Sequence, residues 1–249
     1  MYFFLISKEF LLDTFHYDYH ILTIILTVMI IIWSSIYYFF RAFFPTYSDE
    51  FACRLVTYFH GVIAICSSTI YIVYEKQNPF DSYNYGKEST IVMQIIFSVS
   101  LGYFIYDFVW CVIKNSESYF MMFHHIISIA GLSVAIFSRR YGFELLCTIL
   151  GTEITNPLLQ LRWFLKYFQH KCLRQRFCYC SLINLGFFVI FFFFRIVLGS
   201  LLLYLYLSSD NTDLLGRIGG FTIYVIGWIF WIQILRFVIK KFLFHFTNQ

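Results

Sequence analysis

The chain has 249 residues, of which 60% are hydrophobic and only 13% are charged. A soluble globular domain has about 25% charged residues, so this chain lacks the usual supply for a water-facing surface. The apolar content excludes a disordered chain, and 3 Pro with 12 Gly exclude a collagen-like one. Runs without Asp, Glu, Lys or Arg cover residues 21–40, 55–74 and 218–235. Because about 20 apolar residues cross the hydrocarbon core, we predict an integral membrane protein with several spans.

The net charge of +4 is spread over the loops and the C-terminal region, so the sequence predicts no surface for nucleic acid. The seven cysteines form no C-x-x-C motif, and several lie within apolar runs. We therefore expect reduced thiols that pack as small hydrophobic side chains. Cys172, Cys178 and Cys180 lie near a predicted membrane boundary, where palmitoylation is the alternative to simple packing.

We expect an all-α fold, a polytopic membrane bundle of about seven transmembrane helices. The ten-residue alternating segments of a membrane β-barrel are absent from the sequence, which favours helices. We predict a short N-terminal lead-in at residues 1–19, a transmembrane domain at residues 20–241 and a short cytosolic tail at residues 242–249. In chain order, the predicted spans are 20–41, 55–75, 89–113, 118–138, 143–166, 178–207 and 217–239.

The Lys and Arg residues of the short loops indicate the orientation, because cytosolic loops carry more of them. The side that holds the C-terminus is the richer one, so we predict a cytosolic C-terminus and an N-terminus in the lumen or outside. The richer side carries Arg41, Arg54, Lys114, Lys166, Lys171, Arg174, Arg176, Arg236, Lys240 and Lys241, against Lys8, Lys76, Lys87, Arg139, Arg140 and Arg217 on the other.

Ionisable residues inside spans usually face the bundle interior or a wet cavity, and they mark candidate functional sites. Asp107 precedes Lys114 by seven residues, which places it roughly 10 Å below the membrane edge at about 1.5 Å per residue. By the same measure, His60 and the adjacent His124 and His125 lie about 9 Å below that edge. The sequence therefore predicts a carboxylate and three imidazoles at one level, on three successive spans.

An Asp beside an imidazole fixes its tautomer and raises its basicity, as a general base or a nucleophile requires. Asp107 has Tyr103 and Trp110 at helical spacing. The alternative, which the spacing leaves open, is a buried Asp–His pair that only holds two helices together. Adjacent histidines lack the i, i+4 spacing of ligands on one helix, so we expect no metal. A zinc site built from His60, Asp107 and one residue of the pair is the alternative.

The fifth predicted span carries a polar stripe and a proline. Pro157 removes a backbone donor, so we expect the helix to kink there and to free carbonyl groups. Glu153 needs protonation or a partner at this depth, and Arg195 of the sixth span is the candidate partner. The stripe consists of Glu153, Asn156, Gln160 and Trp163, with Arg162 close by.

Three segments in this order resemble the TLC domain family, which includes the ceramide synthases and smaller TLC domain-containing proteins. They are Tyr106-Asp107-x-x-Trp110, then Phe123-His124-His125-Ile126, then the stretch 152–163, which reads T-E-I-T-N-P-L-L-Q-L-R-W. The resemblance covers roughly residues 50–240. It implies a helical bundle around a narrow lipid-facing tunnel, commonly in the endoplasmic reticulum, with the plasma membrane as the alternative.

In ceramide synthases the His pair is assigned acyl transfer from acyl-CoA to a sphingoid amine. The resemblance then implies that His124 accepts the acyl group or abstracts a proton, and that His125 supports it. The synthases carry an H-D-x-x-D element where this chain has Thr152-Glu153-Ile154-Thr155-Asn156, and the accessory domain and acidic tail are also missing. The E-I-T-N-P form is that of the small TLC domain-containing proteins, which are associated with phospholipid composition and membrane fluidity. Ceramide synthesis is therefore not expected.

We hypothesise a role in membrane lipid metabolism or homeostasis. If the protein is an enzyme, it is a lipid acyltransferase with His124, His125 and Asp107 as catalytic residues, no required cofactor and acyl-CoA as a substrate. A non-catalytic protein that binds or senses lipids is the alternative, and a proton-coupled transporter is a third hypothesis. The expected partners are membrane lipids or acyl chains, and oligomeric state stays open. The expected substrate-binding residues are His60, Tyr103, Trp110, Glu153, Asn156, Gln160 and Arg162.

Overall fold

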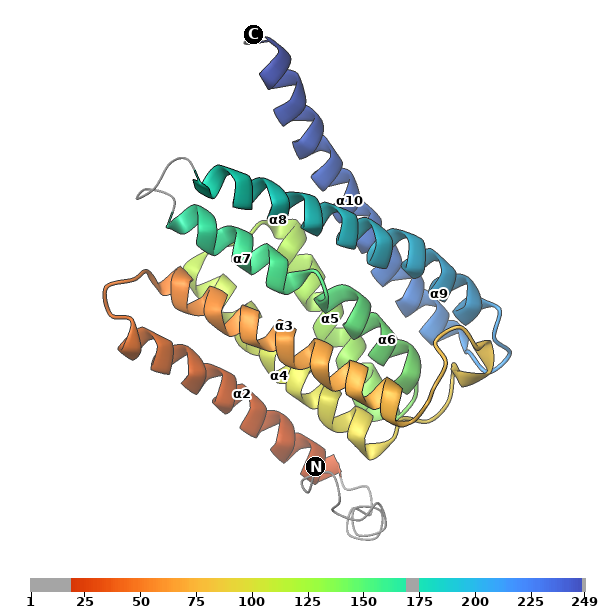
Figure 1. Cartoon of the computed structure of the whole chain (residues 1–249). Helices are drawn as coiled ribbons and strands as arrows, with labels where there is room; N and C mark the ends of the chain where they lie inside the picture. The colour runs from red at the N-terminus through yellow and green to blue at the C-terminus, as the bar shows by residue number, and fades with distance from the viewer. Residues whose placement is uncertain (1–18, 169–174, 248–249) are drawn as a thin grey trace.

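The computed structural model describes residues 19–168 and 175–247, and every regular element in those ranges is helical (Figure 1). The predicted lead-in, residues 1–19, lies almost wholly outside them. The helices are α2 (Tyr19–Phe43), α3 (Asp49–Tyr74), α4 (Ile91–Lys114), α5 (Tyr119–Ser138), α6 (Gly142–Glu153), α7 (Asn156–Tyr167), α8 (Gln175–Phe191), the π-helix η4 (Phe192–Leu198), α9 (Gly199–Leu207) and α10 (Leu214–Thr247), with a short 3-10 turn, η2 (Ser82–Asn84).

Among the described residues, six helices are long and apolar enough to cross a membrane. They are α2, α3, α4, α5, the continuous stretch from α8 through η4 to α9, and α10. The polytopic helical bundle predicted from the sequence is confirmed. The predicted span 143–166 differs from the others, because it is divided into α6 and α7, of 12 residues each, which run end to end (Figure 1).

The helices begin where the sequence provides side-chain caps. Ser48, Thr90 and Ser118 each stand in extended conformation before α3, α4 and α5, and each hydroxyl accepts a hydrogen bond from a backbone N–H of the first turn. Such caps satisfy donors that the helix itself leaves free, and each is typically worth about 1 kcal/mol. These caps fix where three of the spans start.

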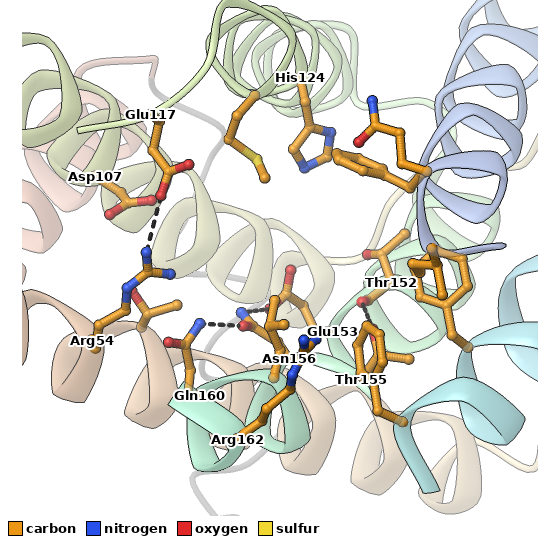
Figure 2. Close-up of a pocket in the computed structure, with 18 of the residues that line it drawn as sticks. Arg54, Asp107, Glu117, His124, Thr152, Glu153, Thr155, Asn156, Gln160 and Arg162 are labelled. Carbon is orange, nitrogen blue, oxygen red and sulfur yellow. Dashed lines mark hydrogen bonds and ion pairs between the residues drawn. The ribbon is translucent and has the colours of Figure 1, made fainter. Parts of the chain in front are cut away.

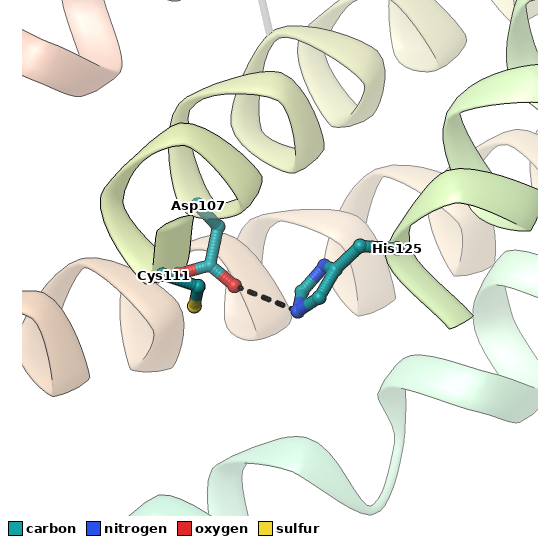
Figure 3. A group of neighbouring side chains, drawn as sticks. All are labelled: Asp107, Cys111 and His125. Carbon is teal, nitrogen blue, oxygen red and sulfur yellow. Dashed lines mark ion pairs between the residues drawn. The ribbon is translucent and has the colours of Figure 1, made fainter. Parts of the chain in front are cut away.

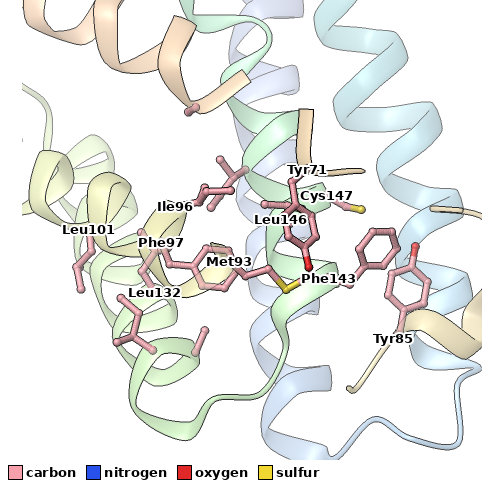
Figure 4. Packing of buried hydrophobic residues seen from close by; sticks show 14 of the residues in the cluster. Tyr71, Tyr85, Met93, Ile96, Phe97, Leu101, Leu132, Phe143, Leu146 and Cys147 are labelled. Carbon is pink, nitrogen blue, oxygen red and sulfur yellow. The ribbon is translucent and has the colours of Figure 1, made fainter. Parts of the chain in front are cut away.

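Helix α4 lies at the centre of the bundle. In its most apolar 18-residue stretch 61% of the residues are buried, against 39% or fewer in each other span. Its residues Met93, Phe97 and Leu101 pack against α5 and α6, where Leu132 and Leu146 belong to the same cluster (Figure 4). Large apolar side chains on the outer helix faces are exposed, as the sides of a bundle in lipid require.

Small residues allow close helix crossings. A Cβ atom added at Gly102 of α4 would lie 2.7 Å from the Cβ of Met29 on α2. A Cβ atom at Gly61 of α3 would lie 3.4 Å from atoms of Asn156 and of Pro157, where α7 begins. Membrane helices associate through such close packing, because lipid supplies no hydrophobic driving force between them.

We predict that Gly102→Ala lowers the free energy of unfolding by about 1–3 kcal/mol, because the methyl group meets α2 at less than contact distance. Gly186→Ala is the matched control, since a Cβ atom there meets nothing within 4 Å. Alanine also favours a helix over glycine by up to about 1 kcal/mol, so the control should be neutral or stabilised. Thermal unfolding of both variants in detergent measures the difference, and equal stabilities would contradict the prediction.

Candidate functional site

A cavity of about 520 Å³ lies inside the bundle, in the half that contains the α2–α3 and α4–α5 connections. Its walls are formed by α3, α4, α5, the end of α6, α7, α8, η4 and α10 (Figure 2). Of the ten residues that the sequence predicted for the site, only His60 is absent from the lining. The nine predicted residues in the wall are Tyr103, Asp107, Trp110, His124, His125, Glu153, Asn156, Gln160 and Arg162.

Asp107 and His125 form a buried carboxylate–imidazole pair. Asp107 lies near the C-terminal end of α4 and His125 near the N-terminal end of α5, so the connection between the two helices brings them together. The distance from His125 Nε2 to Asp107 Oδ2 is 3.5 Å (Figure 3). The contact that the depth estimate predicted is present, and its imidazole is that of His125.

His124 faces a different part of the cavity, because consecutive residues of a helix point about 100° apart. Its ring meets the ring of Phe230 on α10 edge to face, with centroids 5.5 Å apart. In Figure 2 His124 extends from α5 into the cavity, across from Glu153 and Asn156. The two adjacent histidines therefore have separate surroundings, one paired with a carboxylate and one presented to the cavity.

His60 lies behind the cavity wall. Its ring stacks on Tyr103 with centroids 3.8 Å apart, and its Nδ1 is 3.6 Å from Glu153 Oε2. Since Tyr103 precedes Asp107 by one helical turn, His60 lies deeper than Asp107. The expectation that His60 shares the level of Asp107 is wrong, because Cys53, seven residues before His60 on α3, is the residue in contact with Asp107.

The polar stripe of the fifth predicted span is internally hydrogen-bonded. Asn156 Nδ2 donates to Glu153 Oε2 over 2.9 Å, and Gln160 Nε2 donates to Asn156 Oδ1 over 2.9 Å (Figure 2). Arg54 of α3 lies at the same cavity, where it pairs with Glu50 and Glu117. These contacts link Glu153, Asn156 and Gln160 into one chain and tie Arg54 to Glu117 in the cavity wall.

The break between α6 and α7 exposes a backbone carbonyl at the cavity. Pro157 stands in the first turn of α7, where its missing N–H costs no helical hydrogen bond. The carbonyl of Thr152 accepts hydrogen bonds from Arg195 Nη2, over 2.6 Å, and from Thr155 Oγ1, over 3.3 Å. Among the described ion pairs none joins Arg195 to Glu153 within 4 Å, so the hydrogen bond of Arg195 goes to this carbonyl, while its charge still interacts with Glu153 as predicted. The kink expected at Pro157 is a complete break.

The π-helix η4 carries Arg195 at the middle of its long helix. π-helical turns are rare and frequently occur at functional sites. A second cavity of about 330 Å³ begins on the far side of Arg195, between α5, α6, α9 and α10. Thr152 and Arg195 line both cavities, so their hydrogen bond lies between the two spaces.

The site also contains two cysteines that the sequence analysis did not place there. Cys53 Sγ is 3.5 Å from Asp107 Oδ1, and Cys111 lies one turn after Asp107 on the same face of α4. Both are buried, and both line the first cavity. The i, i+4 spacing of Asp107 and Cys111 in the sequence could have predicted that both face the same site. It was not used, because the cysteines lie among apolar residues and were interpreted as small hydrophobic side chains.

Comparison with known proteins agrees with the motifs. The family model of the TLC domain matches residues 50–245, a range that contains every residue placed in the site above. A TLC domain-containing protein 2 from Danio rerio is 28% identical over 147 residues. That alignment covers 58% of this chain and 54% of the relative, so the chain matches about half of the relative's length.

We predict that Arg195→Met lowers the free energy of unfolding by about 1–3 kcal/mol, because the buried carbonyl of Thr152 loses its charged donor. Arg162→Met is the matched control, since Arg162 lies over the ring of Phe237 and at the cavity without a carbonyl partner in the described contacts. Thermal unfolding in detergent compares them. Equal losses in the two variants would show that the Arg195–Thr152 hydrogen bond contributes no more than a cation at the cavity wall.

Proposed function

This chain belongs to the TLC domain family, and we propose that it acts in membrane lipid metabolism as an acyltransferase, with acyl-CoA as the donor. The observation that supports this most directly is the position of His124, which stands in a cavity inside the bundle while its neighbour His125 is paired with Asp107. The endoplasmic reticulum is the proposed location.

In the proposed reaction, an imidazole nitrogen of His124 attacks the thioester carbonyl of acyl-CoA. The C–S bond breaks, the CoA thiolate leaves, and the acyl group stays on the nitrogen. A hydroxyl or amine of a lipid then attacks the acyl carbon, and its proton passes to a nearby base as the C–N bond breaks. Exclusion of bulk water when the substrates fill the cavity would favour transfer to the lipid over hydrolysis. In this proposal Asp107 and His125 act as the orienting pair beside His124.

The charge at the cavity supports an anionic donor. Arg54 and Arg162 line the cavity on the side where the predicted cytosolic loops gather. Arginine binds phosphate groups in a fixed, bidentate geometry, so the phosphates of CoA are suitable partners there. Arg54 is already paired with Glu50 and Glu117, whereas Arg162 lies over the ring of Phe237. Arg162 is therefore the better candidate of the two for binding a phosphate group.

The second cavity supports an apolar acyl chain. Its wall contains many apolar side chains together with glycines at which a Cβ atom would meet nothing within 4 Å. An acyl chain attached at His124 would have to pass Arg195 to enter the second cavity. The Arg195 side chain would then either release the Thr152 carbonyl or stay bound while the acyl chain passes beside it. The glycines with open space are Gly131, Gly151, Gly219 and Gly227.

A non-catalytic lipid-binding function uses the same two cavities. It is favoured by the stripe of Glu153, Asn156 and Gln160, because Asn156 hydrogen-bonds to both of the others within the protein. The proton-relay hypothesis has less support, because the two carboxylates belong to separate sets of contacts. Asp107 pairs with His125, while Glu153 contacts His60 and Asn156. The experiments below distinguish catalysis from binding.

We predict that His124→Gln lowers acyl transfer by 100-fold or more, about the value expected for loss of a catalytic acid–base or nucleophilic group. Asp107→Asn should impair the same activity, since it removes the charge that stabilises an imidazolium. His60→Gln is the matched control, because His60 is buried outside the cavity and its loss acts through stability alone. Lipidomics of cells with matched protein abundance provides the readout. An unchanged acyl profile in His124→Gln would leave lipid binding as the function.

We also predict that Gly131→Phe shifts the accepted acyl chains to shorter lengths, because the new ring fills part of the second cavity. Gly186→Phe is the control, since that position also has open space but lines neither cavity. A series of acyl-CoA donors of increasing chain length, or the chain lengths of co-purified lipids, measures the shift. The same chain-length profile in both variants would place the acyl chain elsewhere.

A further inference from the structure

Three chemically different metal-ligating groups meet beside the first cavity. Asp107 and Cys111 project from one face of α4 at i, i+4 spacing, and His125 approaches them from α5 (Figure 3). One ligand atom from each lies within 4.8 Å of the other two, and all three residues are buried. A carboxylate, a thiol and an imidazole converging inside a membrane bundle have no apolar packing role that would explain all three.

The spacing of these atoms fits a tetrahedral zinc ion. Bonds of about 2.0–2.1 Å to nitrogen and oxygen place two such ligands about 3.4 Å apart on one ion. The observed distance between His125 Nε2 and Asp107 Oδ2 is 3.5 Å, which is long for a hydrogen bond between them. Two ligands that share an ion are expected at this separation.

Cys53 lies outside this ligand group and contacts it from a third helix. Its thiol donates a hydrogen bond of 3.5 Å to Asp107 Oδ1, the carboxylate oxygen that does not face His125. Such a contact orients a ligating carboxylate without binding the ion itself. The fourth position of a tetrahedral ion is then left for a molecule from the adjoining cavity, as in zinc sites with three protein ligands.

We propose that Asp107, Cys111 and His125 bind a zinc ion. One thiolate, one imidazole and one carboxylate form a donor set that zinc accepts and that magnesium and calcium do not prefer. Bound zinc would offset the cost of placing the Asp107 carboxylate away from water. The site would tie α4 and α5 together at the cavity wall. It goes beyond the proposed acyl transfer and does not depend on it.

The proposal replaces the sequence-based expectation of no metal. That expectation rested on the adjacent pair His124 and His125, which cannot both bind one ion from the same helix face. The structure uses only His125 of that pair and adds the Asp107-x-x-x-Cys111 spacing on α4. His124 stays outside the proposed ligand set, facing Phe230 and the cavity.

The test is the metal content of the full-length protein, purified in detergent, supplied with zinc and then dialysed. Elemental analysis should find about one zinc ion per chain in the wild type. Loss of a ligand should lower zinc affinity at least tenfold, so Cys111→Ser and His125→Ala should retain little metal after dialysis. Cys147→Ser and His124→Ala are the matched controls and should keep the zinc, because neither residue belongs to the cluster.

Cobalt substitution tests the geometry and the thiolate ligand. Tetrahedral Co²⁺ bound by a thiolate gives strong visible bands and a sulfur-to-cobalt charge-transfer absorption. We expect that absorption in the wild type and its loss in Cys111→Ser. Cys53→Ser is the matched control and should keep the band, because Cys53 contacts Asp107 from outside the ligand group. An unchanged band in Cys111→Ser would overturn the assignment of Cys111 as a ligand.

Thiol protection in the wild type avoids the question of whether variants fold. Zinc should slow alkylation of Cys111, and a chelator should restore it. A wild-type protein with no more zinc than Cys111→Ser, or alkylation that zinc does not change, would overturn the proposal. Failure of the zinc proposal can be distinguished from failure of the proposed acyl transfer, because His124→Ala is expected to lose acyl transfer and to keep zinc.

Discussion

The bilayer leaves each backbone carbonyl and N–H group without water, so every such group inside it needs a partner in the protein. The interruption between α6 and α7 is where this constraint governs the structure. The break frees the carbonyl of Thr152, and Arg195 reaches it from the π-helical turn of a neighbouring helix. Irregular backbone at this depth is tolerated because it faces other protein groups and a cavity. The two cavities meet at that hydrogen bond.

The central position of α4 determines which residues surround Asp107. Because α4 is enclosed by its neighbours, Asp107 has its partners inside the bundle and not at the lipid surface. Its carboxylate lies between Cys53 on α3 and His125 on α5. One turn deeper, Tyr103 separates His60 from the cavity by stacking on it. Helix α4 thus holds two of the histidines in different surroundings, His125 paired with Asp107 and His60 stacked on Tyr103, while His124 lines the cavity beside Phe230 of α10.

Particular residues show how far prediction could proceed from the sequence. Asp107 and the two adjacent histidines were placed near one level by counting along their helices, and the Asp107–His125 contact agrees with that estimate. His60 was placed by the same count and lies deeper, beside Glu153. Arg195 was expected to pair with Glu153; its charge interacts with that carboxylate, but its hydrogen bond goes to the freed carbonyl of Thr152. The count along a helix gives depth and omits helix tilt and the direction of each side chain.

The sequence by itself determined the apolar spans, the interruption at Pro157 and the presence of polar residues at membrane depth. These follow from properties of single segments, namely hydropathy, the missing proline N–H and the rise of a helix. Only the tertiary structure decided that His125 and not His124 pairs with Asp107, and that Cys53 and Cys111 join them. Partners on different helices depend on how those helices rotate and cross, and close packing at residues such as Gly102 sets that rotation.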